Sequence, residues 1–193
     1  MQLDWITIFD DVVQMIFFDR AFNGEQLTLA ITSGSWMEPV LYRLLVIRPM
    51  RQGNRRVNVI EEVCRLGTLL FLSPLWRALG QSPVWTSAIS RKLLLVLTQN
   101  TVDWNELRPL LIWVLYFATI ETEDLGDQSQ FLFMLATLAS RMQLLDWQEI
   151  MQVVKGVLWS KEVFSSHENA IQDEVMQIVT QNTLLRIDLA ETL

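Results

Sequence analysis

The chain has 193 residues, of which 51% are hydrophobic and 19% are charged, and its formal net charge at pH 7 is −7. This length predicts one domain that buries a core without disulfide staples, and the single cysteine, Cys64, excludes an intrachain disulfide. The acidic balance weighs against a protein that binds nucleic acid over its whole surface.

Helical periodicity begins close to the start of the chain. Over 5–17 the apolar residues keep the three- and four-residue spacing of an amphipathic helix, with acidic residues between them. A second helix is predicted over 36–47, where Pro39 falls in the first turn and is tolerated. Residues 48–56 combine four arginines with proline and glycine, which predicts a basic loop. These arginines are Arg48, Arg51, Arg55 and Arg56.

The next two helices are predicted from caps and breakers. Asn58 opens the first of them, and Pro74 should kink or end it. Apolar residues over 89–97 continue on another helix, with Thr86 or Ser87 as its N-cap.

Residues 110–120 are the most apolar stretch of the chain, with Thr119 as the only polar residue. A helix that is apolar on all sides is either buried in a core or spans a membrane. Eleven residues rise only about 16 Å as a helix, against a hydrocarbon core of ~30 Å. The stretch therefore predicts a buried central helix. It begins either at Asp103, as a capping residue, or nearer Pro109, where the missing N–H is harmless.

Two helices should follow this central one. Asp127 introduces a helix over the apolar residues that end at Met142. Asp146 and Glu149 have the spacing of a capping box, and the stripe over 150–158 is apolar on one side only.

The end of the chain completes an all-helical pattern. Ser165 with Glu168 should cap the last helix, which continues through Val179. No long stretch alternates with period two, so the prediction is an all-α fold. We expect a single helical domain over 1–193, an irregular multi-helix bundle around the buried helix at about 110–120.

Candidate chemistry is sparse. Cys64 and His167 are the only soft or imidazole ligands, whereas a structural zinc site needs four such groups. We therefore expect no metal, no cofactor and no catalytic residues. Asp10 and Asp11 invite comparison with the aspartate-rich motif of helical terpene synthases, although position 14 is Gln and no second ligand motif follows. A terpene-synthase-like helical enzyme is kept as an alternative, as is a membrane-associated protein, because the mean hydropathy is positive at +0.25.

Two further features have both a structural and a functional interpretation. Arg48, Arg51, Arg55 and Arg56 form a patch that suits phosphates or an acidic partner. No aromatic residues lie between these arginines, however, so a solvated loop is the simpler interpretation. The tryptophans at helical spacing should mostly be core residues, and a helical core this aromatic can also line a pocket for an apolar ligand. They are Trp104, Trp113, Trp147 and Trp159.

Several segments resemble a known family in their order and spacing. They are Glu62-Val-Cys-Arg-Leu-Gly-Thr-Leu-Leu-Phe-Leu, Leu110-Leu-Ile-Trp-Val-Leu-Tyr-Phe-Ala, Phe131, and Leu144-Leu-Asp-Trp-Gln-Glu with Leu158-Trp159. Together they resemble the helices of the C-terminal regulatory domain of fungal transcription factors of the binuclear zinc cluster family. The resemblance covers about residues 57–160.

This resemblance implies a non-enzymatic regulator of transcription, located in the nucleus or alternatively in the cytoplasm. It implies action through contacts with other regulatory proteins or with itself, or through sensing of an apolar small molecule. No membrane partner is expected, because the apolar stretch over 110–120 is too short to span a bilayer. The six-cysteine zinc cluster is absent, so we expect no sequence-specific DNA binding by this chain alone. The family's Ala/Gly-rich step after the central helix is also replaced, here by Thr119-Ile-Glu-Thr-Glu.

Overall fold

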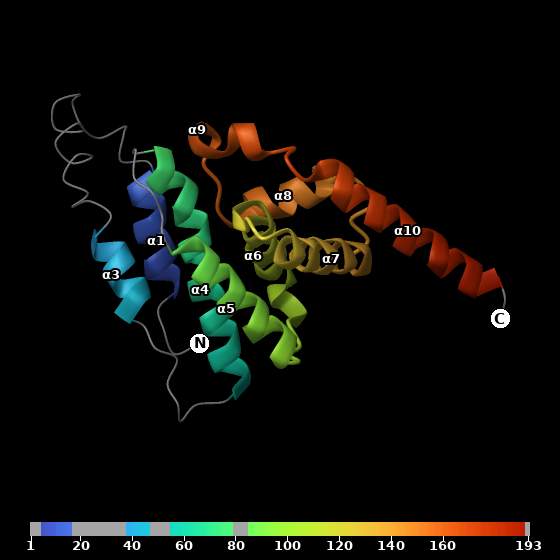
Figure 1. Cartoon of the computed structure of the whole chain (residues 1–193), viewed down its shortest axis with the longest axis horizontal. Helices are drawn as coiled ribbons and strands as arrows, with labels where there is room; N and C mark the ends of the chain where they lie inside the picture. Colours follow the sequence, from blue (N-terminus) through green and yellow to red (C-terminus); the bar gives the residue numbers. More distant parts are fainter. Residues whose placement is uncertain (1–4, 17–37, 47–54, 79–84, 192–193) are drawn as a thin grey trace.

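The computed structural model describes residues 5–16, 38–46, 55–78 and 85–191, and within these ranges all regular structure is helical (Figure 1). The predicted all-α fold is confirmed. The helices are α1 (Trp5–Ile16), α3 (Glu38–Val46), α4 (Arg55–Ala78), α5 (Thr86–Gln99), α6 (Arg108–Glu121), α7 (Leu125–Arg141), α8 (Trp147–Val157), α9 (Lys161–Phe164) and α10 (Gln172–Glu191). Short 3-10 turns, η2 (Asn105–Leu107) and η3 (Ser165–His167), precede α6 and follow α9.

Two helices, α4 and α6, form the centre of the molecule. The predicted central helix is confirmed, because every residue over 111–119 of α6 is buried. In α4 every residue over 60–74 is buried as well. The two helices pack against each other, α5 covers α4, and both α7 and α8 pack on α6. α4 is buried on all sides because α3, α5, α6 and α9 cover it from several directions.

An aromatic cluster joins α4, α6 and α9. Phe71 lies between Trp113 and Phe164, with ring centroids 5.3 Å and 5.0 Å away, and it meets Phe117 edge to face at 4.9 Å. The indole N–H of Trp113 donates a 2.8 Å hydrogen bond to the carbonyl of Leu158. The N–H of a buried tryptophan usually has such a partner, because leaving it without one costs free energy. The ring contacts therefore hold α6 against α4 and α9, and the Trp113 hydrogen bond fixes its position along the helix axis relative to Leu158.

The starts of α8 and α6 agree with the sequence prediction. The predicted capping box is present, since Asp146 accepts from the Glu149 backbone N–H at 2.8 Å and Glu149 accepts in return. α6 begins at Arg108 with Pro109 in its first turn, so the later of its two predicted starts is right. Asp103 instead accepts from the backbone N–H of Asn105, ahead of η2.

Other boundaries differ from the prediction. α4 continues through Pro74 to Ala78, so of the two predicted outcomes, a kink or an end, the end was wrong. Burial of the residues over 60–74 offsets the one helix hydrogen bond that the proline removes. α5 has Trp85 at its N-cap without a side-chain cap, so neither Thr86 nor Ser87 serves. α7 is capped by Asp124, which accepts from the Asp127 N–H at 2.9 Å, three residues earlier than expected.

The last helix also begins later than predicted. Ser165 opens the turn η3, and α10 begins only at Gln172. The Tyr116 hydroxyl donates to the carbonyl of His167 at 2.8 Å, and the Trp147 indole donates to that of Glu168 at 3.2 Å. These two contacts attach the segment before α10 to α6 and α8, and the His167 carbonyl also accepts from the Ala170 N–H at 3.1 Å, in a turn and not in a continuing α-helix. The N-terminal half of α10 lies along α7, and its C-terminal half projects away from the other helices (Figure 1).

Candidate functional site

A pocket of about 640 Å³ lies between α5, α6 and α7, next to the segment that leads into η2. This volume falls within the roughly 300–1,000 Å³ of small-molecule sites. Its lining residues come from four helices and one connecting segment. They are Val59, Leu97, Asn100, Thr101, Val102, Asp103, Trp104, Arg108, Leu111, Leu115, Phe133, Met134, Thr137, Leu138 and Arg141.

The walls of the pocket are mainly apolar. α6 contributes Leu111 and Leu115, which lie one turn apart on the same face. α7 contributes Met134 and Leu138 with the same spacing, and Trp104 comes from the segment before η2. A largely apolar wall with a few polar groups is the usual composition of a site that holds a small organic molecule.

Two arginines are among the polar residues of the lining. Arg108 and Arg141 are exposed, and neither guanidinium group forms a hydrogen bond or an ion pair with another residue in the described ranges. Asp103 is the one acidic residue among the described residues of the lining, and its carboxylate accepts from the Asn105 N–H at 3.1 Å. The described charged residues of the lining are therefore two arginines and one aspartate, which give it a net positive charge.

A hydroxyl in the wall has no partner. The Thr137 Oγ1 atom is buried and forms no hydrogen bond. By contrast Thr119 of α6 and Ser140 of α7 each donate to the carbonyl four residues earlier, at 2.8 Å. A buried donor without an acceptor costs about 1–3 kcal/mol. The pocket wall thus contains one unsatisfied polar group.

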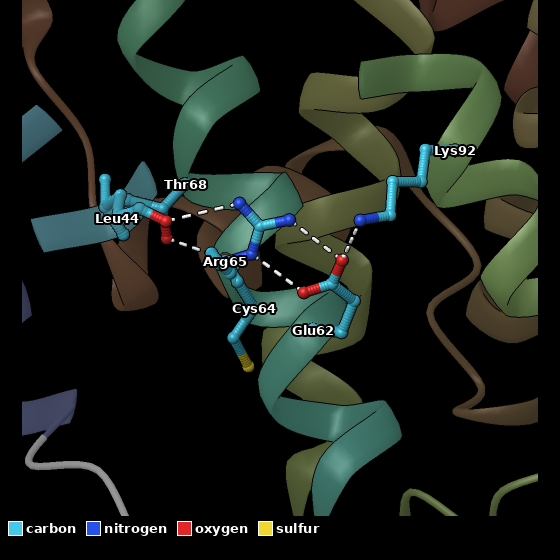
Figure 2. A network of polar contacts seen from close by, with 6 residues as sticks. All are labelled: Leu44, Glu62, Cys64, Arg65, Thr68 and Lys92. Carbon is cyan, nitrogen blue, oxygen red and sulfur yellow. Dashed lines mark hydrogen bonds and ion pairs between the residues drawn. The ribbon is translucent and has the colours of Figure 1, made fainter. Parts of the chain in front are cut away.

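A second polar arrangement lies within α4 (Figure 2). The Arg65 guanidinium donates to both oxygens of Glu62, at 2.7 and 2.8 Å, and also to the carbonyl of Leu44 on α3, at 3.2 Å. Lys92 of α5 completes it, with its Nζ 2.5 Å from Glu62 Oε1. Glu62 and Arg65 are both only 8% exposed, so three helices are joined by a largely buried network of charges.

The electrostatics of this network indicate a structural role. Burial alone would raise the pKa of Glu62, but hydrogen bonds from Arg65 and Lys92 outweigh it, and the pKa of the carboxyl lies below its usual value. The carboxylate is therefore charged, and its oxygens are occupied by cations. Burial raises the pKa of the neighbouring Cys64 thiol to about 12, and the thiol points away from Glu62 and Lys92 (Figure 2). A neutral buried thiol is not a nucleophile at physiological pH.

The predicted arginine patch is only partly described. Arg48 and Arg51 lie outside the described residues. Arg55 and Arg56 begin α4, so the expected basic loop over 48–56 was wrong at these two positions. Arginine has a high helix propensity and no breaker follows Asn54, which explains a helix start ahead of Asn58.

The pocket arginines were missed by the sequence analysis, although a signal for them exists. Only Thr122, Glu123 and Asp124 separate α6 from α7, and helices joined by so short a loop are normally antiparallel neighbours. Such a hairpin brings the start of the first helix beside the end of the second. Arg108 opens α6 and Arg141 ends α7, so the topology alone could have paired them.

The tryptophans divide between core and pocket. Trp113 and Trp147 are buried, and the Trp159 ring lies 5.2 Å from that of Phe164 in the aromatic cluster. Trp104 lines the pocket and is half-buried. Both interpretations of the aromatic residues therefore hold, at different positions.

The aspartates of α1 are placed differently from metal ligands. Asp11 forms an ion pair with Arg43 of α3, and Asp10 is exposed. In the described ranges no three His, Cys, Asp or Glu side chains cluster so as to hold a metal ion. Within the same ranges, the helices are too short or too polar to cross a bilayer.

No family model, no curated protein and no solved structure matches this chain. The geometry of the pocket and the resemblance of the motifs over 57–160 are therefore the observations from which function is argued. Two of those motifs fall on the central helices, with Glu62 on α4 and Trp113 on α6.

Proposed function

We propose that this chain is a non-enzymatic helical domain of the transcription-regulator kind, which senses an apolar small molecule in the pocket beside Trp104. The pocket is the observation that carries this proposal, because its volume and its apolar walls suit a small organic ligand. The motifs that resemble fungal transcription factors support the regulatory part, and a nuclear location follows from that part.

Ligand binding can be coupled to partner binding through α7. Phe133 lines the pocket and yet remains 58% exposed, so a ligand in the pocket alters a surface that a partner can contact. A ligand that binds only the folded state also stabilises the helices that surround it. Partners would be other regulatory proteins or a second copy of the chain, which recognise the ligand-bound surface.

Binding of a neutral apolar dye tests the pocket. Nile red fluorescence should rise on titration with the protein and saturate at a single site. Thr137→Phe places a ring in the lumen and should abolish this signal, whereas Leu145→Phe, at an exposed position outside the pocket, should leave it unchanged. Circular dichroism melting of both variants shows whether each is folded. Nile red binding that survives Thr137→Phe in a folded variant would place the dye elsewhere and contradict the proposal.

A reporter assay tests the regulatory part. The chain fused to an unrelated DNA-binding module should change transcription from a reporter promoter, and Thr137→Phe should alter that output. Leu145→Phe serves as the matched control with the same added ring. Equal output from the module alone and from the fusion would reject regulation while leaving ligand binding intact.

A further inference from the structure

We infer that the ligand of this pocket is an anionic amphiphile, whose apolar body lies against α6 and α7 and whose negative head group is bound by Arg108 and Arg141. This inference rests on the proposed function, since it names the class of molecule that the pocket would take. The argument depends on the charges in the lining and on where they lie in the helices.

An exposed arginine on its own needs no partner, because water solvates it. Here two guanidiniums without protein partners in the described ranges line one pocket, opposed by a single carboxylate. That carboxylate, Asp103, already accepts from the Asn105 N–H. Guanidinium groups bind carboxylates and phosphates through paired hydrogen bonds. The lining therefore favours an anion over a neutral or cationic head group.

Helix energetics account for one of these arginines and not for the other. Arg141 lies in the last turn of α7, where a cation interacts favourably with the helix dipole. Arg108 is the first residue of α6, at the positive end of that helix, where a cation is unfavourable. The first turn of α6 holds no acidic residue, and its N-cap makes no side-chain hydrogen bond. An anion bound beside Arg108 would compensate both the guanidinium charge and the positive helix end.

The apolar walls require that the rest of the ligand be apolar. Leu111, Leu115, Met134 and Leu138 offer no side-chain hydrogen bond, so a wholly polar molecule would lose its bonds to water without replacement. A compact inorganic anion would also leave these walls uncovered. An alkyl or polycyclic body with one anionic end meets both requirements.

Displacement of Nile red by matched amphiphiles tests the inference. Dodecanoate, dodecyl phosphate, dodecanol and dodecyltrimethylammonium share one chain and differ in head group, and each is used below its critical micelle concentration at pH 8. The anions should displace the dye at concentrations about tenfold lower than dodecanol, and the cation should be the weakest. A tenfold and not a larger preference is expected because both guanidiniums are exposed and water screens them. The tighter of the two anions identifies the head group.

Charge-removing variants connect this preference to the two arginines. The double variant Arg108→Gln with Arg141→Gln should bring dodecanoate to the level of dodecanol without changing dodecanol itself. Arg91→Gln is the control, because Arg91 is exposed, lies 3.7 Å from Asp127 and does not line the pocket. Added salt should weaken the anion preference and leave dodecanol unaffected.

Two results would overturn the inference. Equal displacement by dodecanoate and dodecanol in the unmodified protein would show that the pocket does not prefer an anionic head group. The proposed function would stand in that case, because the pocket would still bind an apolar molecule. Association with phosphatidylglycerol vesicles, without displacement by monomeric dodecanoate, would indicate a membrane surface as the target. These two results differ from a failure of the proposed function. If the proposed function is wrong, Nile red either does not bind the protein or binds the folded Thr137→Phe variant as well.

Discussion

Gly67 of α4 lies directly against Val114 of α6, so that a β-carbon on residue 67 would be 2.6 Å from Val114 Cγ2 and 2.9 Å from its Cγ1. Carbon atoms in favourable contact are about 3.5–4.0 Å apart. The missing side chain therefore lets the two central helices approach closely. At the far ends of the same helices Arg77 pairs with the buried Glu121, so α4 and α6 are held at two points. Their spacing in turn sets where Leu111 and Leu115 stand in the pocket.

The variant Gly67→Ala should destabilise the protein. Alanine gains about 1 kcal/mol over glycine in a helix, but overpacking a buried contact costs about 1–3 kcal/mol, and the stiff branched side chain of Val114 cannot move aside. We expect a net loss of up to about 2 kcal/mol in urea unfolding. The control is Gly156→Ala in α8, where an added β-carbon meets nothing within 4 Å and stability should rise. Similar gains at the two glycines would show that α4 and α6 are not in close contact at this point.

The variant Glu62→Gln should remove part of the acid sensitivity of the fold. The pKa of Glu62 is lowered on folding, below its ordinary value of 4.5, so its contribution to stability is complete well above that value. It is lost as the pH falls from about the ordinary value through the lower folded value. Unfolding followed from pH 7 to pH 2 should therefore give a steep acid limb in the unmodified protein and a flatter one in Glu62→Gln.

The same variant should be less stable at neutral pH, by about 3 kcal/mol, because Arg65 loses the charge that compensates it in a buried site. Glu123→Gln, at an exposed position, is the control and should leave both the stability and the acid limb nearly unchanged. An acid limb of the same slope in Glu62→Gln would mean that other carboxylates govern acid unfolding.

Cys64 should react with thiol reagents only after unfolding. Its side chain is fully buried, and burial raises the pKa of the thiol to about 12, so the thiolate is almost absent at pH 8. Native protein incubated with N-ethylmaleimide at pH 8 should stay unlabelled by mass spectrometry, and protein in guanidinium chloride should gain one adduct. Labelling of native protein as fast as that of free cysteine would show that the α4 region opens readily.

Sequence patterns were sufficient where local chemistry decides the structure. The capping box of Asp146 and Glu149 and the apolar run of α6 need no knowledge of the rest of the fold. The start of α10 could not be found this way, because the carbonyl of His167 is held by Tyr116, which is distant in sequence. The fully buried surface of α4 is likewise a result of tertiary packing.

Part of the candidate site could be predicted from the sequence. The expectation that tryptophans could line a pocket holds for Trp104. The sequence pattern indicated the arginines over 48–56 as the basic site and did not indicate Arg108 and Arg141, which line the pocket. A cluster along the chain is easy to see, whereas two residues at the ends of neighbouring helices are brought together only by the hairpin of α6 and α7. The pocket exists because side chains from four helices leave a space between them unfilled. The periodicity of apolar residues in the sequence does not predict such a space.

The variant Thr137→Val tests the unsatisfied hydroxyl in the pocket wall, and Thr119→Val is its matched partner. Both changes replace a hydroxyl by a methyl group within a helix and keep the branched β-carbon, so helix propensity changes equally. Thr119 loses a 2.8 Å hydrogen bond to the Leu115 carbonyl, which should cost about 1 kcal/mol in urea unfolding. Thr137 has no bond to lose, so its valine variant should be as stable as the unmodified protein or up to about 1 kcal/mol more stable. Equal losses in the two variants would mean that a bound water or ligand satisfies the Thr137 hydroxyl, and Nile red displacement repeated on Thr137→Val would then separate the two.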